Sequence, residues 1–291
     1  MSTTVFKARV VAAHGRSCRV MDERGTVSPA RPARRELQAV CGDEVRCEHD
    51  RQHDELRIIE RLPRRSLLER TDNRGRREAL AANLTLLAVV VAPAPAPDFF
   101  MVDRYLAAAA CLGVHGAVLA NKQDLGYDTG TGAELDALAR IGYPVLPCCT
   151  RAGSGLDALR EHLRGETAVL VGQSGAGKSS LLRALVPDSD ASVGELDRSN
   201  AGRHTTTTAR LCLLQGGGAL IDSPGVRDFA PALQELEPAT LGFVDVARLA
   251  PQCRFQDCRH LAEPGCAVRA AVLSGQIDPR RYQSYLRLRE G

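Results

Sequence analysis

The order of two nucleotide-binding motifs constrains the fold of this 291-residue chain more than any other feature. The tetrad Asn121-Lys122-Gln123-Asp124 lies upstream of a glycine-rich segment that runs GQSGAGKS from Gly172 to Ser179. A guanine-nucleotide switch normally presents the glycine-rich loop first and the tetrad later. We infer a domain whose original ends were joined and whose chain was opened elsewhere. Such a permutation is tolerated because domain termini usually lie close together on the surface.

The tetrad predicts a guanine reader. It follows the apolar segment 117–120, and the Asp124 carboxylate would accept hydrogen bonds from N1 and N2 of guanine. Adenine has an acceptor at N1 and no donor at C2, so the pair of motifs favours GTP. For the tetrad alone, the alternative is a polar turn on the surface. A second base-contacting loop is expected at Cys149-Thr150, where backbone amides would meet guanine O6, although many GTPases have Ser-Ala-Lys there. We therefore predict that GTP is bound by Asn121, Lys122, Gln123, Asp124, Cys149 and Thr150.

The glycine-rich segment lies between an apolar strand, 168–171, and a predicted helix, 178–185. This context is typical of a phosphate-binding loop, in which glycines allow backbone amides to face phosphate oxygens. Lys178 is expected to reach the β- and γ-phosphates, and Ser179 to ligate Mg²⁺. A glycine-rich turn without a ligand is the alternative. The predicted GTP-binding residues of this segment are Gly172, Gln173, Ser174, Gly175, Ala176, Gly177, Lys178, Ser179 and Ser180.

The sequence Asp222-Ser223-Pro224-Gly225 ends another apolar segment, 219–221. We expect Asp222 to hold Mg²⁺ through water and the Gly225 amide to meet the γ-phosphate. Val226 follows, at the position where Ras-like enzymes place a water-orienting glutamine. Either hydrolysis is slow, or another residue positions the attacking water.

That other residue is sought in the long polar segment 187–208, which contains Gly202-Arg203-His204 and then four threonines. Thr206 is predicted to close on Mg²⁺ and the γ-phosphate in the triphosphate state. His204 is predicted to orient or deprotonate the water. A surface histidine in a long loop is the alternative.

Charge separates the amino-terminal part from the rest. Residues 1–77 hold 18 basic and 12 acidic side chains, whereas residues 78–230 hold 12 and 16. This asymmetry indicates a polyanionic partner, with RNA favoured over a membrane, and a well-solvated arginine-rich surface is the alternative. The longest apolar run, 84–91, is too short to cross a bilayer, and we see no signal peptide. We expect a cytoplasmic monomer with no membrane partner.

Three cysteines and a histidine predict a metal site. Cys253, Cys258, His260 and Cys266 lie within fourteen residues. Three thiolates and an imidazole are typical of one structural Zn²⁺ with no open coordination position. Reduced core cysteines are the alternative, because a chain that is not exported seldom keeps disulfides.

The periodicity of apolar residues predicts three domains with different folds. Residues 1–63 suit a small β-barrel or an irregular β-extension, 64–230 a doubly wound α/β domain, and 231–291 a mainly helical domain. The proline-rich segment 92–97 is interpreted as a stiff connection only. Strands are expected at 5–12, 17–21, 43–48, 55–60, 84–91, 116–120, 144–146, 168–171, 211–214 and 219–221. Helices are expected at 99–111, 133–141, 156–163, 178–185 and 280–289.

Taken in order, these motifs resemble the RsgA family of circularly permuted GTPases. The likeness includes the run Cys-Arg-Phe-x-Asp-Cys-x-His that starts at Cys253, the pair Gly42-Asp43, and Arg65-Ser66-x-Leu68-x-Arg70. The resemblance implies an amino-terminal OB-fold that binds RNA, a permuted P-loop GTPase core and a carboxy-terminal zinc domain. It also implies late maturation of the small ribosomal subunit, with GTP hydrolysis stimulated by that subunit. The catalytic histidine of the family would fall on His204.

Two other classes of function stay open. One is a P-loop phosphotransferase that acts on a small molecule or uses ATP. The other is a non-hydrolysing, nucleotide-gated RNA-binding module, in which Val226 reflects the loss of hydrolysis.

Overall fold

The structure of the chain, a computed structural model, describes residues 5–15, 17–50, 55–71, 77–186, 209–222 and 240–290. The chain forms two compact units. The barrel unit comprises Met1–Thr85, Leu156–Leu170 and Lys178–Ala230, and the tetrad unit comprises Leu86–Gly155, Val171–Gly177 and Pro231–Gly291. Within the described ranges, no helix combines the length and the apolar character needed to span a bilayer.

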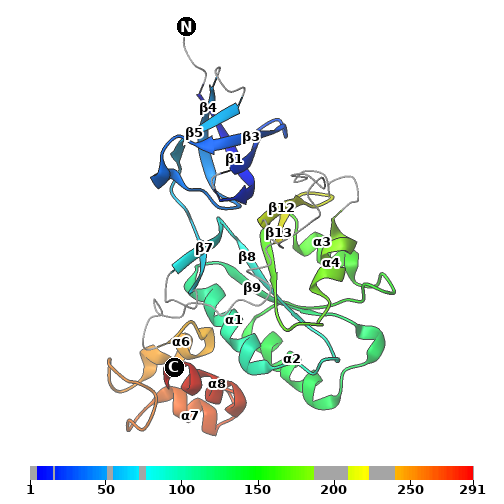
Figure 1. Ribbon diagram of the computed structural model, residues 1–291. Coiled ribbons are helices and arrows are strands. Elements are labelled where there is room, and N and C mark those ends of the chain that lie inside the picture. Colours follow the sequence, from blue (N-terminus) through cyan, green and yellow to red (C-terminus); the bar gives the residue numbers. More distant parts are fainter. Residues whose placement is uncertain are drawn as a thin grey trace. The chain divides into compact units, whose positions relative to one another are not determined.

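The amino-terminal part of the barrel unit is a closed five-stranded barrel, shown in blue in Figure 1. Its strands follow the order β1-β2-β3-β5-β4, and a further pairing of β1 with β4 closes the ring. The expected small β-barrel is therefore confirmed, with a fifth strand that was not predicted because it contains Pro29 and Pro32, which normally interrupt strands. The five strands are β1 (Val5–His14), β2 (Ser17–Asp22), β3 (Val27–Pro32), β4 (Glu44–Asp50) and β5 (Glu55–Arg61).

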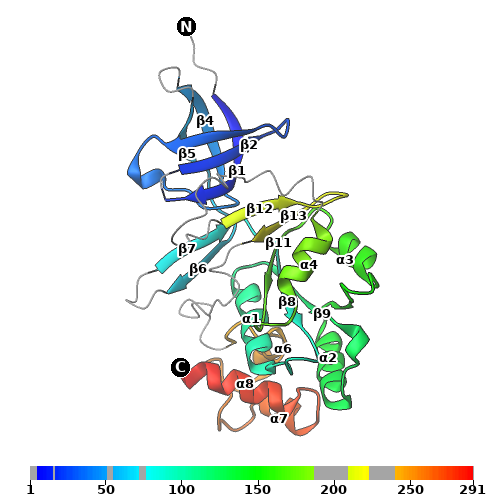
Figure 2. The same ribbon diagram turned by 45° about the vertical axis from the view of Figure 1, so that its right-hand side comes forward.

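The remaining strands of the barrel unit build a small sheet that continues from the barrel. β13 pairs in parallel with β11 and antiparallel with β12, and β12 pairs with the barrel strand β1 through Ala13 and Ala209. A separate hairpin joins β6 to β7, and Figure 2 shows these two strands side by side. The elements are β6 (Leu67–Thr71), β7 (Arg77–Ala82), α3 (Leu156–His162), β11 (Thr167–Val171), α4 (Lys178–Leu185), β12 (Ala209–Leu213) and β13 (Ala219–Asp222), with the short helix η1 (Arg35–Leu37) in the barrel.

The pair Gly42-Asp43 lies where the barrel meets the hairpin β6–β7 and its flanking residues. The Asp43 carboxylate is fully buried and accepts hydrogen bonds from Arg64 Nε at 2.7 Å and Arg64 Nη2 at 2.8 Å. Gly42 O accepts a hydrogen bond from Asn83 Nδ2 at 3.0 Å. The backbone at Gly42 is left-handed, with φ of 93°, and a Cβ there would lie 2.1 Å from Ala82 O. Only glycine fits at this junction.

We predict that Gly42→Ala lowers the free energy of unfolding by about 3 kcal/mol, because the added methyl group meets a backbone oxygen that cannot move aside. Gly25→Ala is the matched control. Gly25 has a similar φ of 84° but no atom within 4 Å of a Cβ, so its cost is limited to about 1 kcal/mol of backbone strain. Denaturant unfolding followed by circular dichroism measures both, and equal costs would contradict the argument.

The tetrad unit is built on three parallel strands in the order β10-β9-β8. Every residue of β8 is buried, which explains its continuous apolar sequence LLAVVV. Asp128 caps α2 by accepting from Thr131 N, and the helix therefore begins four residues before the expected start at Ala133. The elements are β8 (Leu86–Val91), α1 (Phe99–Cys111), β9 (His115–Ala120), η2 (Gln123–Leu125), α2 (Thr129–Ile141), β10 (Val145–Pro147), α6 (Val244–Leu249), η5 (Ala250–Gln252), α7 (Ala267–Leu273) and α8 (Pro279–Glu290).

The carboxy-terminal helices pack around Phe243 and Tyr285 and are fastened to α1 by a buried arginine. Arg281, in α8, is 1% exposed. Its Nη1 donates to Asp103 of α1 at 2.5 Å, and its Nε and Nη2 each donate to Asp245 of α6 at 2.9 Å. Burial alone would lower the pKa of Arg281, but the carboxylates of Asp245 and Asp103 outweigh it and raise that pKa. The guanidinium is therefore always charged and joins three helices.

Candidate functional site

The phosphate-binding loop has the strand and the helix that its sequence predicts on either side. β11 ends at Val171, and α4 begins at Lys178. Gly177 has a left-handed backbone with φ of 101°, and a Cβ there would lie 2.2 Å from Asn121 Nδ2. The loop therefore passes in contact with the tetrad, and a side chain at this position would separate them.

Asn121 joins the tetrad to the phosphate-binding loop. Its side chain is fully buried at the end of β9, and its Nδ2 donates to Ala176 O at 3.0 Å. Tyr127 OH donates to Asn121 O at 2.9 Å and so holds the tetrad backbone from the other side. Two motifs that are 55 residues apart in the sequence thus share one hydrogen bond.

Lys122 contacts the proline-rich segment that we interpreted as a connection only. Lys122 has a left-handed backbone with φ of 57°, and its Nζ donates to Ala94 O at 2.7 Å. Directly after this segment, Asp98 N donates to Gln173 Oε1 of the phosphate-binding loop at 3.3 Å. The segment therefore supports both motifs. One feature of the sequence could have indicated this supporting role: the segment directly follows the apolar strand β8.

The base-contacting loop after β10 meets the tetrad through a side chain. Asp124 lies exposed in η2, next to Gln123, and Cys149 Sγ donates to Asp124 Oδ1 at 3.1 Å. The Cys149 amide donates to Ser154 O at 2.9 Å. Of the two residues predicted to contact guanine O6, Thr150 is therefore the one whose amide would donate to it.

Two of the three predicted magnesium ligands, Ser179 and Asp222, lie on elements of the barrel unit. Ser179 and Ser180 lie in the first turn of α4, directly after the largely buried Lys178. Asp222 is the last residue of β13, which runs parallel to β11 with Val169 opposite Ile221. Because parallel strands end at the same edge, Asp222 lies at the edge of the sheet toward which β11 also runs.

Three predicted residues cannot be placed. His204, Thr206 and Gly225 lie outside the described residues, so their roles stay predictions.

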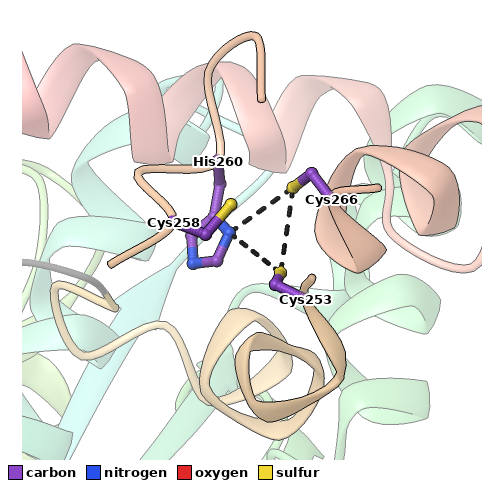
Figure 3. A group of neighbouring side chains, drawn as sticks. All are labelled: Cys253, Cys258, His260 and Cys266. Carbon is purple, nitrogen blue, oxygen red and sulfur yellow. Dashed lines mark hydrogen bonds between the residues drawn. The ribbon is translucent and has the colours of Figure 1, made fainter. Parts of the chain in front are cut away.

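The four predicted metal ligands converge (Figure 3). Their ligand atoms all lie within 4.8 Å of one another. His260 Nδ1 is 3.5 Å from both Cys253 Sγ and Cys266 Sγ, and these two sulfurs are 4.0 Å apart. His260 has a left-handed backbone with φ of 59°, and its carbonyl accepts a hydrogen bond from Tyr282 OH at 2.5 Å. Local backbone geometry thus turns the imidazole toward the thiols.

The electrostatics of this cluster suit a cation. Burial raises the pKa of the Cys258 thiol to about 12, and burial lowers the pKa of His260. Without a cation the Cys258 thiol therefore keeps its proton, and burial favours the neutral form of the His260 imidazole, which is the form that can ligate a metal. A divalent metal would replace the thiol protons, because metal binding and thiol deprotonation are coupled. The residues present fit a closed, four-ligand metal site.

We predict that Cys258→Ser reduces the bound divalent metal from about one equivalent to a fraction of one, and lowers the thermal midpoint, because metal binding contributes to folding. Cys111→Ser is the control, since Cys111 is exposed and lies outside the cluster. Elemental analysis of the purified chains and thermal unfolding measure the two effects. Full metal retention in Cys258→Ser would exclude this cluster as the site.

Residues 61–231 of the chain match the family model described as RsgA GTPase. Two relatives carry the name "Small ribosomal subunit biogenesis GTPase RsgA". The chain is 46% identical over 233 residues to that of Azotobacter vinelandii, covering 78% of this chain and 68% of the relative. It is 44% identical over 239 residues to that of Hahella chejuensis, covering 80% and 68%.

Two crystal structures resemble the whole chain. YjeQ from Thermotoga maritima aligns with a TM-score of 0.76 and 27% identity, covering 99% of this chain and 98% of that one. YloQ, a circularly permuted GTPase, aligns with a TM-score of 0.77 and 24% identity, covering 99% and 94%. The predicted fold class, an amino-terminal barrel followed by a permuted P-loop domain and a carboxy-terminal helical part with a Cys/His cluster, is confirmed.

Proposed function

The chain belongs to the RsgA GTPase family, and we propose that it binds the small ribosomal subunit and hydrolyses GTP during late assembly of that subunit, which in turn stimulates hydrolysis. We further propose that it works as a cytoplasmic monomer. The three modules of this function are residues 1–63, which bind RNA, 64–230, which bind and hydrolyse GTP, and 231–291, which bind Zn²⁺.

The observation that carries the proposal is the contact between Asn121 and Ala176. A P-loop alone holds phosphates of any nucleotide, whereas a tetrad bonded to that loop places a guanine-reading carboxylate at a fixed distance from the phosphate tail. Asp124 is the acceptor for N1 and N2 of guanine in this proposal, and its carboxylate lies exposed in η2. The same contact supports GTP over ATP.

Hydrolysis is assigned to the chain's own residues at the phosphate end. Lys178 neutralises phosphate charge, and Ser179, Thr206 and Asp222 would hold Mg²⁺, which offsets charge on the β- and γ-phosphates. His204 orients the attacking water and accepts its proton, since Val226 cannot do so. The Gly225 amide donates to the γ-phosphate.

The cation of the Cys253-Cys258-His260-Cys266 cluster is proposed to be one structural Zn²⁺. Three sulfurs and one imidazole nitrogen are the donor set that tetrahedral structural zinc prefers, and harder cations such as Mg²⁺ prefer oxygen.

RNA is proposed to bind the barrel through a basic groove of about 780 Å³. Its lining includes His14, Arg31, Arg34 and Arg35 and no acidic residue. Arg31 is paired with Glu55 at 2.9 Å, whereas Arg34 and Arg35 form no ion pair within the described ranges. Exposed guanidinium groups along this groove suit a phosphate backbone.

A non-hydrolysing, nucleotide-gated RNA-binding module is the second candidate, and Val226 is the observation that favours it.

We predict that purified small ribosomal subunits accelerate phosphate release from GTP by this protein, and that His204→Ala lowers the stimulated rate about 100-fold, because a general base is lost. Co-sedimentation with GTP, GDP or a non-hydrolysable analogue shows whether His204→Ala still binds the subunit, and large subunits serve as the control. Binding without phosphate release under any condition would favour the non-hydrolysing module.

We also predict that Asp124→Asn weakens GDP binding at least about tenfold, because an amide offers one acceptor where the carboxylate accepts two hydrogen bonds. Displacement of a fluorescent guanine nucleotide by GDP and by ADP measures the affinity and the preference. If ADP competes as well as GDP against the unaltered protein, the phosphotransferase alternative gains and the guanine reader is wrong.

A further inference from the structure

The first strand of the barrel connects the proposed RNA surface to the strands that carry the nucleotide motifs. His14, at the end of β1, lines the basic groove that is proposed to bind RNA. Ala12 and Ala13 of the same strand pair with β12. Arg9, further back along the strand, reaches Thr167 at the start of β11. All of these contacts lie within the barrel unit.

Arg9 makes its contact with β11 through a single directional bond. Its Nη2 donates to Thr167 Oγ1 at 2.7 Å. The Arg9 side chain is half-buried, and burial lowers its pKa. Within the described ranges Arg9 forms no ion pair, because Glu44, its partner across β4, is engaged by Lys7 at 2.8 Å and by Arg65 at 3.2 Å. Burial of a guanidinium costs free energy that one bond to a neutral hydroxyl offsets only in part. The contact is therefore specific in direction and adds little to stability.

Thr167 is held from two further directions. Its amide donates to Thr85 Oγ1 at 2.8 Å, and its carbonyl accepts a hydrogen bond from Thr85 N at 2.9 Å. The Thr167 side chain is buried, so its hydroxyl is shielded from water that could replace Arg9 as a donor. The start of β11 is thus fixed by Thr85 through the backbone and by Arg9 through the side chain.

The position of Thr167 affects two nucleotide motifs at once. β11 has five residues, from Thr167 to Val171, and the phosphate-binding loop begins at the next residue, Gly172. β13 pairs with β11 in parallel, with Ala219 opposite Thr167, and ends at Asp222. Close-packed interiors have low compressibility and transmit strain. A displacement of Thr167 by the barrel would therefore be passed along β11 and β13.

We propose that Arg9 is a positioning residue for GTP hydrolysis: its bond to Thr167 transmits the binding of RNA at the barrel to the strand that carries the phosphate-binding loop. The inference rests on the proposed function and deepens it, because it assigns the stimulation by the small subunit to one contact of the chain. In this mechanism the groove at His14 binds the RNA. Arg9 acts through β11 and does not touch the nucleotide.

The test measures GTP turnover with and without saturating amounts of purified small ribosomal subunits. We expect Arg9→Met to keep the unstimulated rate and the GDP affinity within about twofold, and to lower the stimulated rate about tenfold, a typical size for coupling between two sites. Thr167→Val removes the acceptor and has the same expected effect. Thr167→Ser keeps the acceptor and retains the stimulation.

Lys7→Met is the matched control. Lys7 lies on the same face of β1 as Arg9, because side chains alternate along a strand, and it pairs with Glu44 of the barrel. This substitution removes the same positive charge without touching the contact with β11, so we expect full stimulation at saturation. Co-sedimentation measures the affinity for the subunit in each variant and separates weaker binding from lost transmission.

A chain that carries both Arg9→Met and Thr167→Val shows whether the two residues act as one bond. If they do, the stimulated rate of the double variant falls about tenfold, as in each single variant. Independent effects would multiply to about 100-fold.

The inference is overturned if Arg9→Met retains full stimulation, if Lys7→Met loses as much, or if the unstimulated rate falls as far as the stimulated one. A 100-fold loss in the double variant would also overturn it. Should circular dichroism show that Arg9→Met fails to fold, Thr167→Val, which keeps the shape of the side chain, decides the question. Failure of the proposed function looks different. The unaltered protein itself would then show no stimulation by small subunits, and this inference would fall with it.

Discussion

The hydrogen bond from Asn121 Nδ2 to Ala176 O, 3.0 Å long and shielded from water, is the contact on which the nucleotide site depends. Without it a buried amide and a loop carbonyl would both lack a partner, which is costly in an apolar surrounding. The bond also explains how a permuted chain keeps its chemistry. The bond joins two residues that lie close together in space, and it can form whichever of the two motifs comes first along the chain.

A buried arginine fixes the arrangement of the carboxy-terminal helices in a similar way. Arg281 meets Asp103 and Asp245 at 2.5–2.9 Å, and removal of three charges from water cancels much of the attraction between them. Such a group specifies one arrangement more than it adds stability. An apolar contact would tolerate a shift of α8 along α1, whereas these directional bonds do not. The helices that surround the Cys/His cluster are therefore held in a defined register relative to α1.

Local signals in the sequence predicted most elements, and tertiary contacts explain the rest. The helix expected at 280–289 is observed as α8, and the apolar run at 84–91 contains the buried strand β8. β3 was not predicted because it contains two prolines, which normally interrupt strands. The metal ligands were predictable because they are close in sequence, whereas the contact of Cys149 with Asp124 joins two loops that no periodicity relates. His204, Thr206 and Gly225 lie outside the described residues, so their proposed roles stay predictions from the sequence.

The pairing of β1 with β12 has a consequence for any shortened form of the chain. β12 would otherwise be an edge strand with free amides and carbonyls along one side, and the barrel covers that side through Ala12 and Ala13. Open edges recruit strands from other molecules. A chain that lacks residues 1–63 would expose this edge of β12. If such a chain self-associates, the cause would be the exposed strand edge and not a misfolded nucleotide domain.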